Sequence, residues 1–171
     1  MLVARCIFVN VCARASPRFL HVSTTCQRYR GSKPYSIDSK GRCAVPPAWR
    51  PGPGEVLYLL SSRAHDMPML KVLTQEGYDD RVAIVKNSNL SEAKKRQKIG
   101  SLAMLCRDAS INDQGKLLIP KDLSEQAGIK PDSDIMLAGR EEHFEIWNLQ
   151  SYQRYLEIER NQDDADELGI L

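Results

Sequence analysis

A ten-residue motif occurs twice in this 171-residue chain, and the duplication limits the folds that the chain can adopt. The first copy spans residues 37–46 (IDSKGRCAVP) and the second spans residues 111–120 (INDQGKLLIP), 74 residues later. This spacing exceeds the ~20–50 residues at which solenoid repeats recur. Each copy joins a polar, glycine-containing sequence to a short apolar run ending at proline, which is typical of a tight turn entering a strand. The chain is therefore predicted to contain a duplicated half-domain.

The chain has the length of one ordinary domain, so we expect one compact unit or two small fused halves. Its formal net charge is only +2, but the charges are unevenly distributed. Residues 1–50 carry nine Lys or Arg and a single acid, whereas six acids and one Arg follow residue 156. The basic part is compatible with phosphate binding and equally with a solvated surface, and the acidic end is typical of a solvated tail.

The five cysteines and three histidines are scattered along the chain. No two cysteines form a CxxC pair, and none has a histidine at zinc-ligand spacing. An odd, dispersed set of cysteines also argues against a secreted disulfide scaffold. The sequence has no GxSxG motif, no phosphate-binding glycine loop and no stretch of ~20 apolar residues. We therefore expect no metal, no cofactor, no small-molecule substrate, no membrane partner and no enzymatic activity.

Residues 1–27 differ from the rest of the chain because they combine apolar runs with arginines and contain no acid. A secretory signal fits this segment least, since Arg5 lies close to the apolar run. A transit peptide fits better, because such peptides are rich in Arg and poor in acids. The third interpretation is an appended leader or misassigned start, expected to be disordered, and a GTG codon for Val22 would place the true start there.

Both halves are expected to contain a strand after the turn and then a two-stranded hairpin. The strands are predicted at 42–45, 56–60 and 69–73 in the first half and at 116–119, 135–137 and 144–147 in the second. The second half also contains a predicted short helix over 121–127, which Gly128 closes as its C-cap.

Apolar residues recur at near-helical intervals over 90–106, which predicts one helix joining the halves with Ser91 as its N-cap. Basic side chains at 94–98 cover its other faces, which is normal for a helix surface and also compatible with DNA contact. A final helix is predicted at about 149–160.

The repeated turn carries the charged groups with the clearest chemical meaning. Gly41 and Gly115 stand where a turn needs positive φ or a close backbone approach. In the first copy, Asp38 precedes Arg42 by four residues, so the carboxylate can pair with the guanidinium across the turn. Such a pair would stiffen the turn and contribute at most ~1 kcal/mol when exposed. In the alternative interpretation, Lys40 and Arg42 project toward phosphates or the O6/N7 edge of guanine.

Longer blocks of sequence occur in order around both motifs. They are Tyr29-Arg30-Gly31, 36–42 (SIDSKGR), 45–46 and 49–50 in the first half, and 113–120 (DQGKLLIP), 127–128, 135–139 and 144–147 in the second. This order is similar to that of the MraZ family of bacterial transcriptional regulators over about residues 29–155. Chains of that family usually start just before the motif that is Tyr29-Arg30-Gly31 here, which favours the interpretation of residues 1–27 as a leader or misassigned start.

The resemblance implies an α+β fold. In it, two AbrB-like (SpoVT-AbrB) swapped-hairpin modules form a double-psi-like β-barrel with short helices and a linking helix. The corresponding division is a leader at 1–27, a first module at 29–80, a linking helix region at 81–106, a second module at 107–152, and a C-terminal helix end with an acidic tail at 153–171.

The resemblance also implies a cytoplasmic, nucleoid-associated regulator that forms homo-oligomeric rings. Its partner would be double-stranded DNA, bound at short direct repeats upstream of the cell-division and cell-wall operon. The predicted DNA-binding residues are Arg42, Lys40, Lys116 and Lys33, and the predicted turn-structuring residues are Asp38, Gly41, Asn112 and Gly115. Two alternatives stay open: an AbrB- or antitoxin-like repressor of another operon, and a ring-forming scaffold that binds a protein.

The second copy departs from the family's Asp-x-x-x-Arg turn. Asn112 replaces the acid, and Lys116 replaces the Arg. A lysine still neutralises a phosphate, but it lacks the guanidinium fork that recognises a base edge through two hydrogen bonds. The second turn is therefore predicted to read sequence less well than the first.

Overall fold

The computed structural model describes residues 28–52 and 54–161, so the predictions for residues 1–27 and for the tail at 162–171 lie outside the described residues. The first half contains β1 (Ser32–Ser36), β2 (Arg42–Ala44), the 3₁₀-helix η1 (Pro47–Trp49), β3 (Leu57–Ala64), β4 (Met67–Leu73) and α1 (Gln75–Asn87). The second half contains α2 (Glu92–Leu105), β5 (Cys106–Ala109), β6 (Lys116–Leu118), α3 (Lys121–Gln126), β7 (Asp134–Gly139), β8 (Phe144–Asn148) and α4 (Leu149–Asn161).

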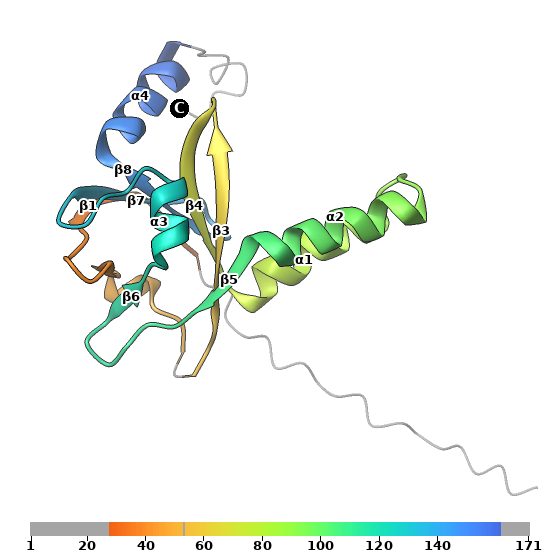
Figure 1. Ribbon diagram of the computed structural model, residues 1–171, viewed down its shortest axis with the longest axis horizontal. Coiled ribbons are helices and arrows are strands. Elements are labelled where there is room, and N and C mark those ends of the chain that lie inside the picture. The colour runs from red at the N-terminus through yellow and green to blue at the C-terminus, as the bar shows by residue number, and fades with distance from the viewer. Residues whose placement is uncertain (1–27, 53, 162–171) are drawn as a thin grey trace, which may run out of the picture.

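The strands of the two halves are interleaved. Six of them form one antiparallel sheet in the order β1-β7-β8-β4-β3-β5, and β2 and β6 form a separate two-stranded ribbon (Figure 1). Four pairs cross between the halves: β1 with β7, β4 with β8, β3 with β5, and β2 with β6. The predicted mixed α+β class is confirmed, and so are the two hairpins β3–β4 and β7–β8.

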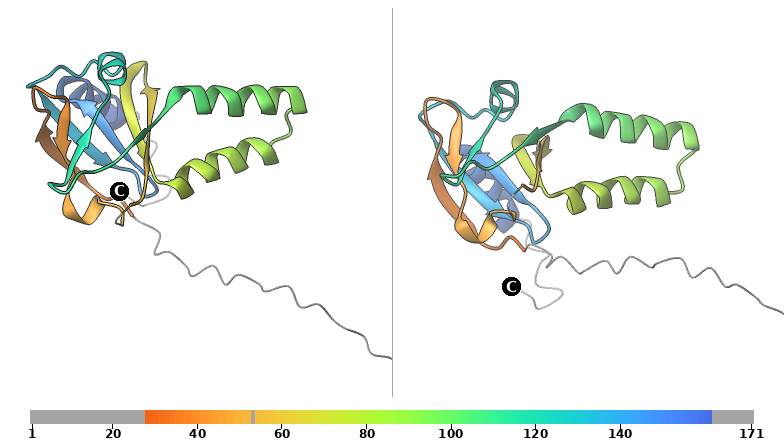
Figure 2. Two further views of the ribbon diagram at one scale, coloured as in Figure 1. Left: turned by 60° about the horizontal axis from the view of Figure 1, so that its bottom comes forward. Right: turned by 90° about the horizontal axis from the view of Figure 1, so that it is seen from below.

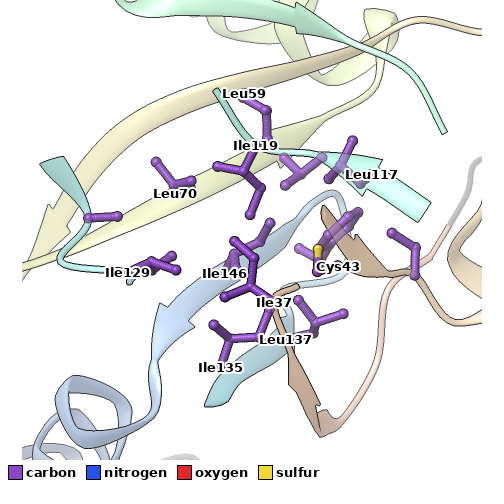
Figure 3. Close-up of a cluster of buried hydrophobic side chains, with 14 of the residues drawn as sticks. Ile37, Cys43, Leu59, Leu70, Leu117, Ile119, Ile129, Ile135, Leu137 and Ile146 are labelled. Carbon is purple, nitrogen blue, oxygen red and sulfur yellow. The ribbon is translucent and has the colours of Figure 1, made fainter. Parts of the chain in front are cut away.

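The main core is built by apolar side chains from both halves. The side chains of β7 alternate between two clusters. Ile135 and Leu137 enter the main core, whereas Ala138 packs in a second cluster with Trp147 and α4. Successive side chains of a strand point to opposite faces, so the ribbon covers one face of the sheet and α4 covers the other. The labelled core residues of Figure 3 point toward one another from both halves: Ile37, Cys43, Leu59, Leu70, Leu117, Ile119, Ile129, Ile135, Leu137 and Ile146.

The helix predicted over 90–106 is present as α2, but a second helix, α1, which the sequence did not predict, precedes it. Two antiparallel helices, α1 and α2, lie side by side and project away from the sheet (Figure 2). The Ser88 and Ser91 backbones are extended between them, and the polar run at 87–89 favours such a turn because its side chains compete for backbone hydrogen bonds. The N-cap prediction is confirmed, since the Ser91 hydroxyl accepts a hydrogen bond from the Lys94 N–H.

The two shorter predictions in the second half are confirmed. Helix α3 begins after Pro120, and Gly128 follows its end with φ of +65°, the left-handed conformation of a helix C-cap. Helix α4 buries Tyr152 and Tyr155 against the sheet. Within the described part of the chain, no helix combines the length and apolar character needed to cross a membrane.

Candidate nucleic-acid interface

The first copy of the motif folds into a turn that Asp38 organises. The Gly41 N–H donates to the Asp38 carbonyl at 2.9 Å, and Gly41 adopts φ of +76°. The Asp38 side chain also takes part: its Oδ1 accepts hydrogen bonds from the N–H groups of Lys40 at 3.0 Å and Arg42 at 2.9 Å. This is the Asx arrangement, in which a short polar side chain caps backbone donors two and four residues on.

The second copy folds in the same way around an amide. Gly115 donates to the Asn112 carbonyl at 2.8 Å and adopts φ of +74°. The Asn112 Oδ1 accepts from the N–H groups of Gln114 at 3.1 Å and Lys116 at 2.9 Å. Both glycines and both Asx residues thus have the turn-structuring geometry expected from the sequence. An acid is not required to build this turn.

The two turns lie at opposite ends of the antiparallel β2–β6 ribbon. Beyond its strand pairs, the Val45 N–H donates to the Gly115 carbonyl at 3.0 Å, and the Ile119 N–H donates to the Gly41 carbonyl at 2.9 Å. Because these two bonds are equivalent under the 74-residue repeat, the ribbon has approximate two-fold symmetry. Each turn is therefore held by the strand that follows the other turn.

The two repeated cations meet at one carboxylate oxygen. Asp38 Oδ2 accepts from Arg42 Nε at 2.9 Å and lies 2.9 Å from Arg42 Nη2, and Lys116 Nζ lies 3.4 Å from the same oxygen. The three side chains are between 28% and 35% exposed. Backbone and guanidinium hydrogen bonds from Arg42 hold the pKa of Asp38 below its usual range. Asn112 carries no charge, and the ion-pair partner of Lys116 comes from the other copy.

Two other predicted DNA-binding residues lie away from this carboxylate. Lys40 is exposed on the first turn, where its backbone N–H donates to Asp38 Oδ1. Lys33 is exposed on β1, with its ammonium 5.7 Å from the centre of the Trp49 ring. The structure therefore brings Arg42, Lys116 and Asp38 together but does not bring Lys33 into the same cluster.

Arg50 is a further charged residue of the ribbon region, and its role was not predicted from the sequence. Its guanidinium lies against Gly115 so closely that a Cβ on this glycine would overlap it. Its Nε donates to the Val45 carbonyl at 2.9 Å. Gly115 thus serves two purposes, a positive φ and the close approach of Arg50. Neither Arg50 nor the contact between Lys116 and Asp38 can be read from motif spacing, because both depend on the pairing of β2 with β6.

The arrangement displays Arg42 and Lys116 on a two-stranded ribbon. Among residues 28–52 and 54–161, no cluster of three or more His, Cys, Asp or Glu side chains is placed to hold a metal ion. Leu118, which pairs with Arg42 across the ribbon, is 54% exposed. The chemistry that this surface offers is the binding of anions through Arg and Lys, beside an apolar contact.

Comparisons with known proteins agree on one family. A family model described as "MraZ protein, putative antitoxin-like" matches residues 108–170. The chain is 30% identical over 131 residues to the protein named Transcriptional regulator MraZ of Methylibium petroleiphilum, which covers 74% of this chain and 84% of that relative. It is 27% identical over 145 residues to the protein of the same name from Leuconostoc citreum, covering 81% of this chain and 94% of the relative. The chain belongs to the MraZ family.

Proposed function

We propose that this protein is a DNA-binding transcriptional regulator and that the paired turns are its DNA-reading surface. The observation that carries the proposal is the convergence of Arg42 and Lys116 on Asp38 at a two-stranded ribbon. The major groove of B-DNA admits a two-stranded β-ribbon, and Arg is the side chain best suited to guanine there. The name that the relatives carry, Transcriptional regulator MraZ, supports the same function.

In this proposal the residues have different tasks. Asp38 positions Arg42 through its Nε and Nη2 groups, so the two Nη1–H donors stay outside that ion pair. Lys116 and Lys40 act as point charges toward phosphates, and Lys33 adds a charge at the flank. Arg42 would therefore carry most of the base recognition and the lysines most of the sequence-independent affinity.

The proposal extends to the assembly and its target. The interleaved strands support a swapped-hairpin, double-psi-like barrel of the AbrB type, with modules at 29–80 and 107–152 contributing strands to each other. Several such chains in a ring would place several ribbons on one DNA, and their contacts would add avidity where repeat spacing matches subunit spacing. The target would be short direct repeats upstream of the cell-division and cell-wall operon, in the cytoplasm and at the nucleoid.

A mobility-shift titration with the DNA upstream of the gene tests this function. We expect Arg42→Ala to abolish specific binding, and Lys116→Ala to lower affinity with a smaller loss of discrimination between specific and unrelated DNA. Lys116→Arg should tighten binding, because it restores the guanidinium fork to the second turn. Lys86→Ala, at the last turn of α1, is the matched control and should bind like the wild type.

Salt provides the second measurement. The affinity should fall steeply as ionic strength rises, because each phosphate contact releases counterions. Equal losses in the Arg42 and Lys116 variants would refute the ranking of the two turns. Absence of affinity for this DNA at low salt would refute the regulator and favour the protein-binding scaffold.

A second candidate, an antitoxin-like repressor of another operon, is favoured by the description of the matching family model. The two candidates differ in the DNA that they select. Recovery of genomic fragments bound by the purified protein, followed by sequencing, distinguishes them. Enrichment of the upstream region of the cell-division genes supports the first, and enrichment of a toxin operon supports the second.

A further inference from the structure

A pocket of 330 Å³ opens between the first turn and α3. Its apolar walls are formed by Leu118, Ile119, Pro120, Ile129 and Pro131. Ile119 and Ile129 also belong to the main core (Figure 3), so the inner wall of the pocket is formed by core residues. Pockets that bind small molecules have this size and this mainly apolar lining, with a few polar groups that orient the ligand.

The internal repeat explains why this space is open. Ser124 lines the pocket and stands 74 residues after Arg50, so the two residues hold equivalent positions in the two halves. The Arg50 guanidinium packs against Gly115. Ser124 is short, and its hydroxyl donates to the Ile129 carbonyl at 2.7 Å. A Cβ added to Gly115 would overlap the Arg50 guanidinium, whereas a Cβ added to Gly41 would meet only the Ile119 carbonyl oxygen, at 3.2 Å, among the described atoms. The pocket is therefore the unfilled counterpart of the Arg50 site.

The charge around the two equivalent sites differs. The turn beside Arg50 carries Asp113 and Gln114, whereas the turn at the pocket carries Ser39 and Lys40 at the same repeat positions. A second lysine, Lys121, and one acid, Glu125, also line the pocket. These two lie 3.8 Å apart in an exposed pair, which water screens strongly, and Lys40 leaves the lining with one positive charge in excess. At these two repeat positions the site that holds a guanidinium has an acid and an amide, whereas the open site has a hydroxyl and a lysine. Asp38 of the same turn is already paired with Arg42 and Lys116.

We propose that this pocket binds a small anion with an apolar body, a carboxylate or phosphate attached to an aliphatic chain or ring. The apolar part lies against Leu118, Ile119 and Ile129, and the anionic group lies between Lys40 and Lys121. Because Lys40 belongs to the first turn, the bound anion neutralises one of the proposed DNA contacts and weakens DNA binding. This effect on DNA rests on the proposed function, whereas the binding of the anion does not.

Octanoate is the probe, and octylammonium, which has the same chain length and the opposite charge, is its control. We expect octanoate, titrated into the full chain, to shift the amide NMR signals of Gly41 and Ile129 with millimolar affinity, and octylammonium to leave them unchanged. The double variant K40E/K121E should lose octanoate binding, while Gln114→Glu, at the equivalent position of the other turn, should retain it. Both lysines and Gln114 are exposed, so these changes leave the core intact.

The proposal is overturned if octanoate does not bind, if octylammonium binds equally well, or if K40E/K121E binds octanoate like the wild type. A further variant, Ser124→Arg, places an arginine in the pocket as Arg50 does at the equivalent site, and it should abolish octanoate binding. Its melting temperature shows whether it folds. If it does not fold, K40E/K121E alone tests the site. If the wild type does not bind octanoate and K40E/K121E forms a smaller oligomer than the wild type, another copy of the chain covers the pocket. That result would also overturn the proposal.

A DNA titration separates the two proposals. Octanoate should lower the DNA affinity of the wild type several-fold and leave that of a folded Ser124→Arg variant unchanged. Octanoate binding by a chain without DNA affinity would remove the regulatory consequence and the proposed function but keep the site. DNA binding that octanoate at saturation does not alter would overturn the regulatory part alone.

Discussion

At the scale of single residues, Asp38 joins the two copies of the motif. Its Oδ1 atom builds the first turn, and its Oδ2 atom pairs with both Arg42 and Lys116. The second turn shows that an amide performs the first task equally well, because Asn112 makes the same two backbone hydrogen bonds. The backbone of the turn therefore does not depend on the negative charge of this side chain.

The first prediction follows from this independence of backbone and charge. Asp38→Asn should keep the turn and lower the melting temperature by only a few degrees, since a part-exposed ion pair contributes at most ~1 kcal/mol. It should lower the affinity and specificity for DNA, because Arg42 loses the partner that orients it. Asn112→Asp, which keeps the second turn and adds an acid there, is the comparison. Circular dichroism measures the melting temperature, and mobility shift measures DNA binding. A variant Asp38→Asn that unfolds, or that binds DNA as tightly as the wild type, would show that the carboxylate has another role.

Residue types indicated the turns correctly because the Asx and glycine positions act locally. The Lys116 contact with Asp38 and the packing of Arg50 against Gly115 act between segments that are distant in sequence. Each depends on the register of β2 against β6. That register is decided by the burial of residues in both halves, so a single copy of the motif holds no information about it.

At the scale of elements, strand β8 places a charged residue beneath α4. Glu145 is 4% exposed, and its Oε2 accepts from Arg140 Nε at 3.1 Å and from Trp147 Nε1 at 3.0 Å. The Arg140 guanidinium in turn lies 5.0 Å from the centre of the Tyr155 ring on α4. Burial alone would raise the pKa of Glu145, but the imidazole of His143, Arg140 and the indole N–H together lower it to about 2.

The second prediction concerns this carboxylate. Its folded pKa is below the ordinary value of 4.5, so its stabilisation is complete above pH 4.5 and is lost as the pH falls toward 2. A shift of this size corresponds to about 3 kcal/mol of unfolding free energy. Glu145→Gln should be destabilised at pH 7, because Arg140 loses its counter-ion, and should show a flatter pH dependence.

Urea unfolding between pH 7 and pH 3 measures this effect. Glu157→Gln, which alters an exposed glutamate of α4, should follow the wild-type curve. A Glu145→Gln variant with the pH slope of the wild type would mean that other carboxylates cause the loss of stability in acid.

The elements also show where periodicity is informative. The helix α4 and the two hairpins were predictable, because each buries a regular set of apolar residues. Helix α1 was missed, since among its residues only Gly77 is buried and Ile84 is 69% exposed. Strand β1 carries mostly exposed residues and Pro34, and its extended form comes from pairing with β7 rather than from its own composition.

At the scale of the whole molecule, the halves hold each other through strand pairs rather than through the helical hairpin. Helix α2 buries none of its residues, whereas β1–β7, β2–β6 and β4–β8 all join one half to the other. The covalent connection through α1 and α2 is thus separate from the contacts that stabilise the core.

The third prediction tests this separation. A protease site inserted at 88–90, between α1 and α2, should be cut without loss of the fold, and the two fragments should elute together from a sizing column. They should separate only in denaturant, because the core contains side chains from both. The uncut insertion variant is the control. Fragments that elute separately in buffer would mean that each half folds alone.

The interleaved sheet also affects synthesis on the ribosome. Ser32 pairs with Ala138, so strand β1 leaves the exit tunnel long before its partner exists. With about a hundred residues between them and a rate of ~5–20 residues per second, β1 waits for ~5–20 s with its hydrogen-bonding edge unpaired. The edge of β1 therefore stays open to pairing with other strands until β7 emerges.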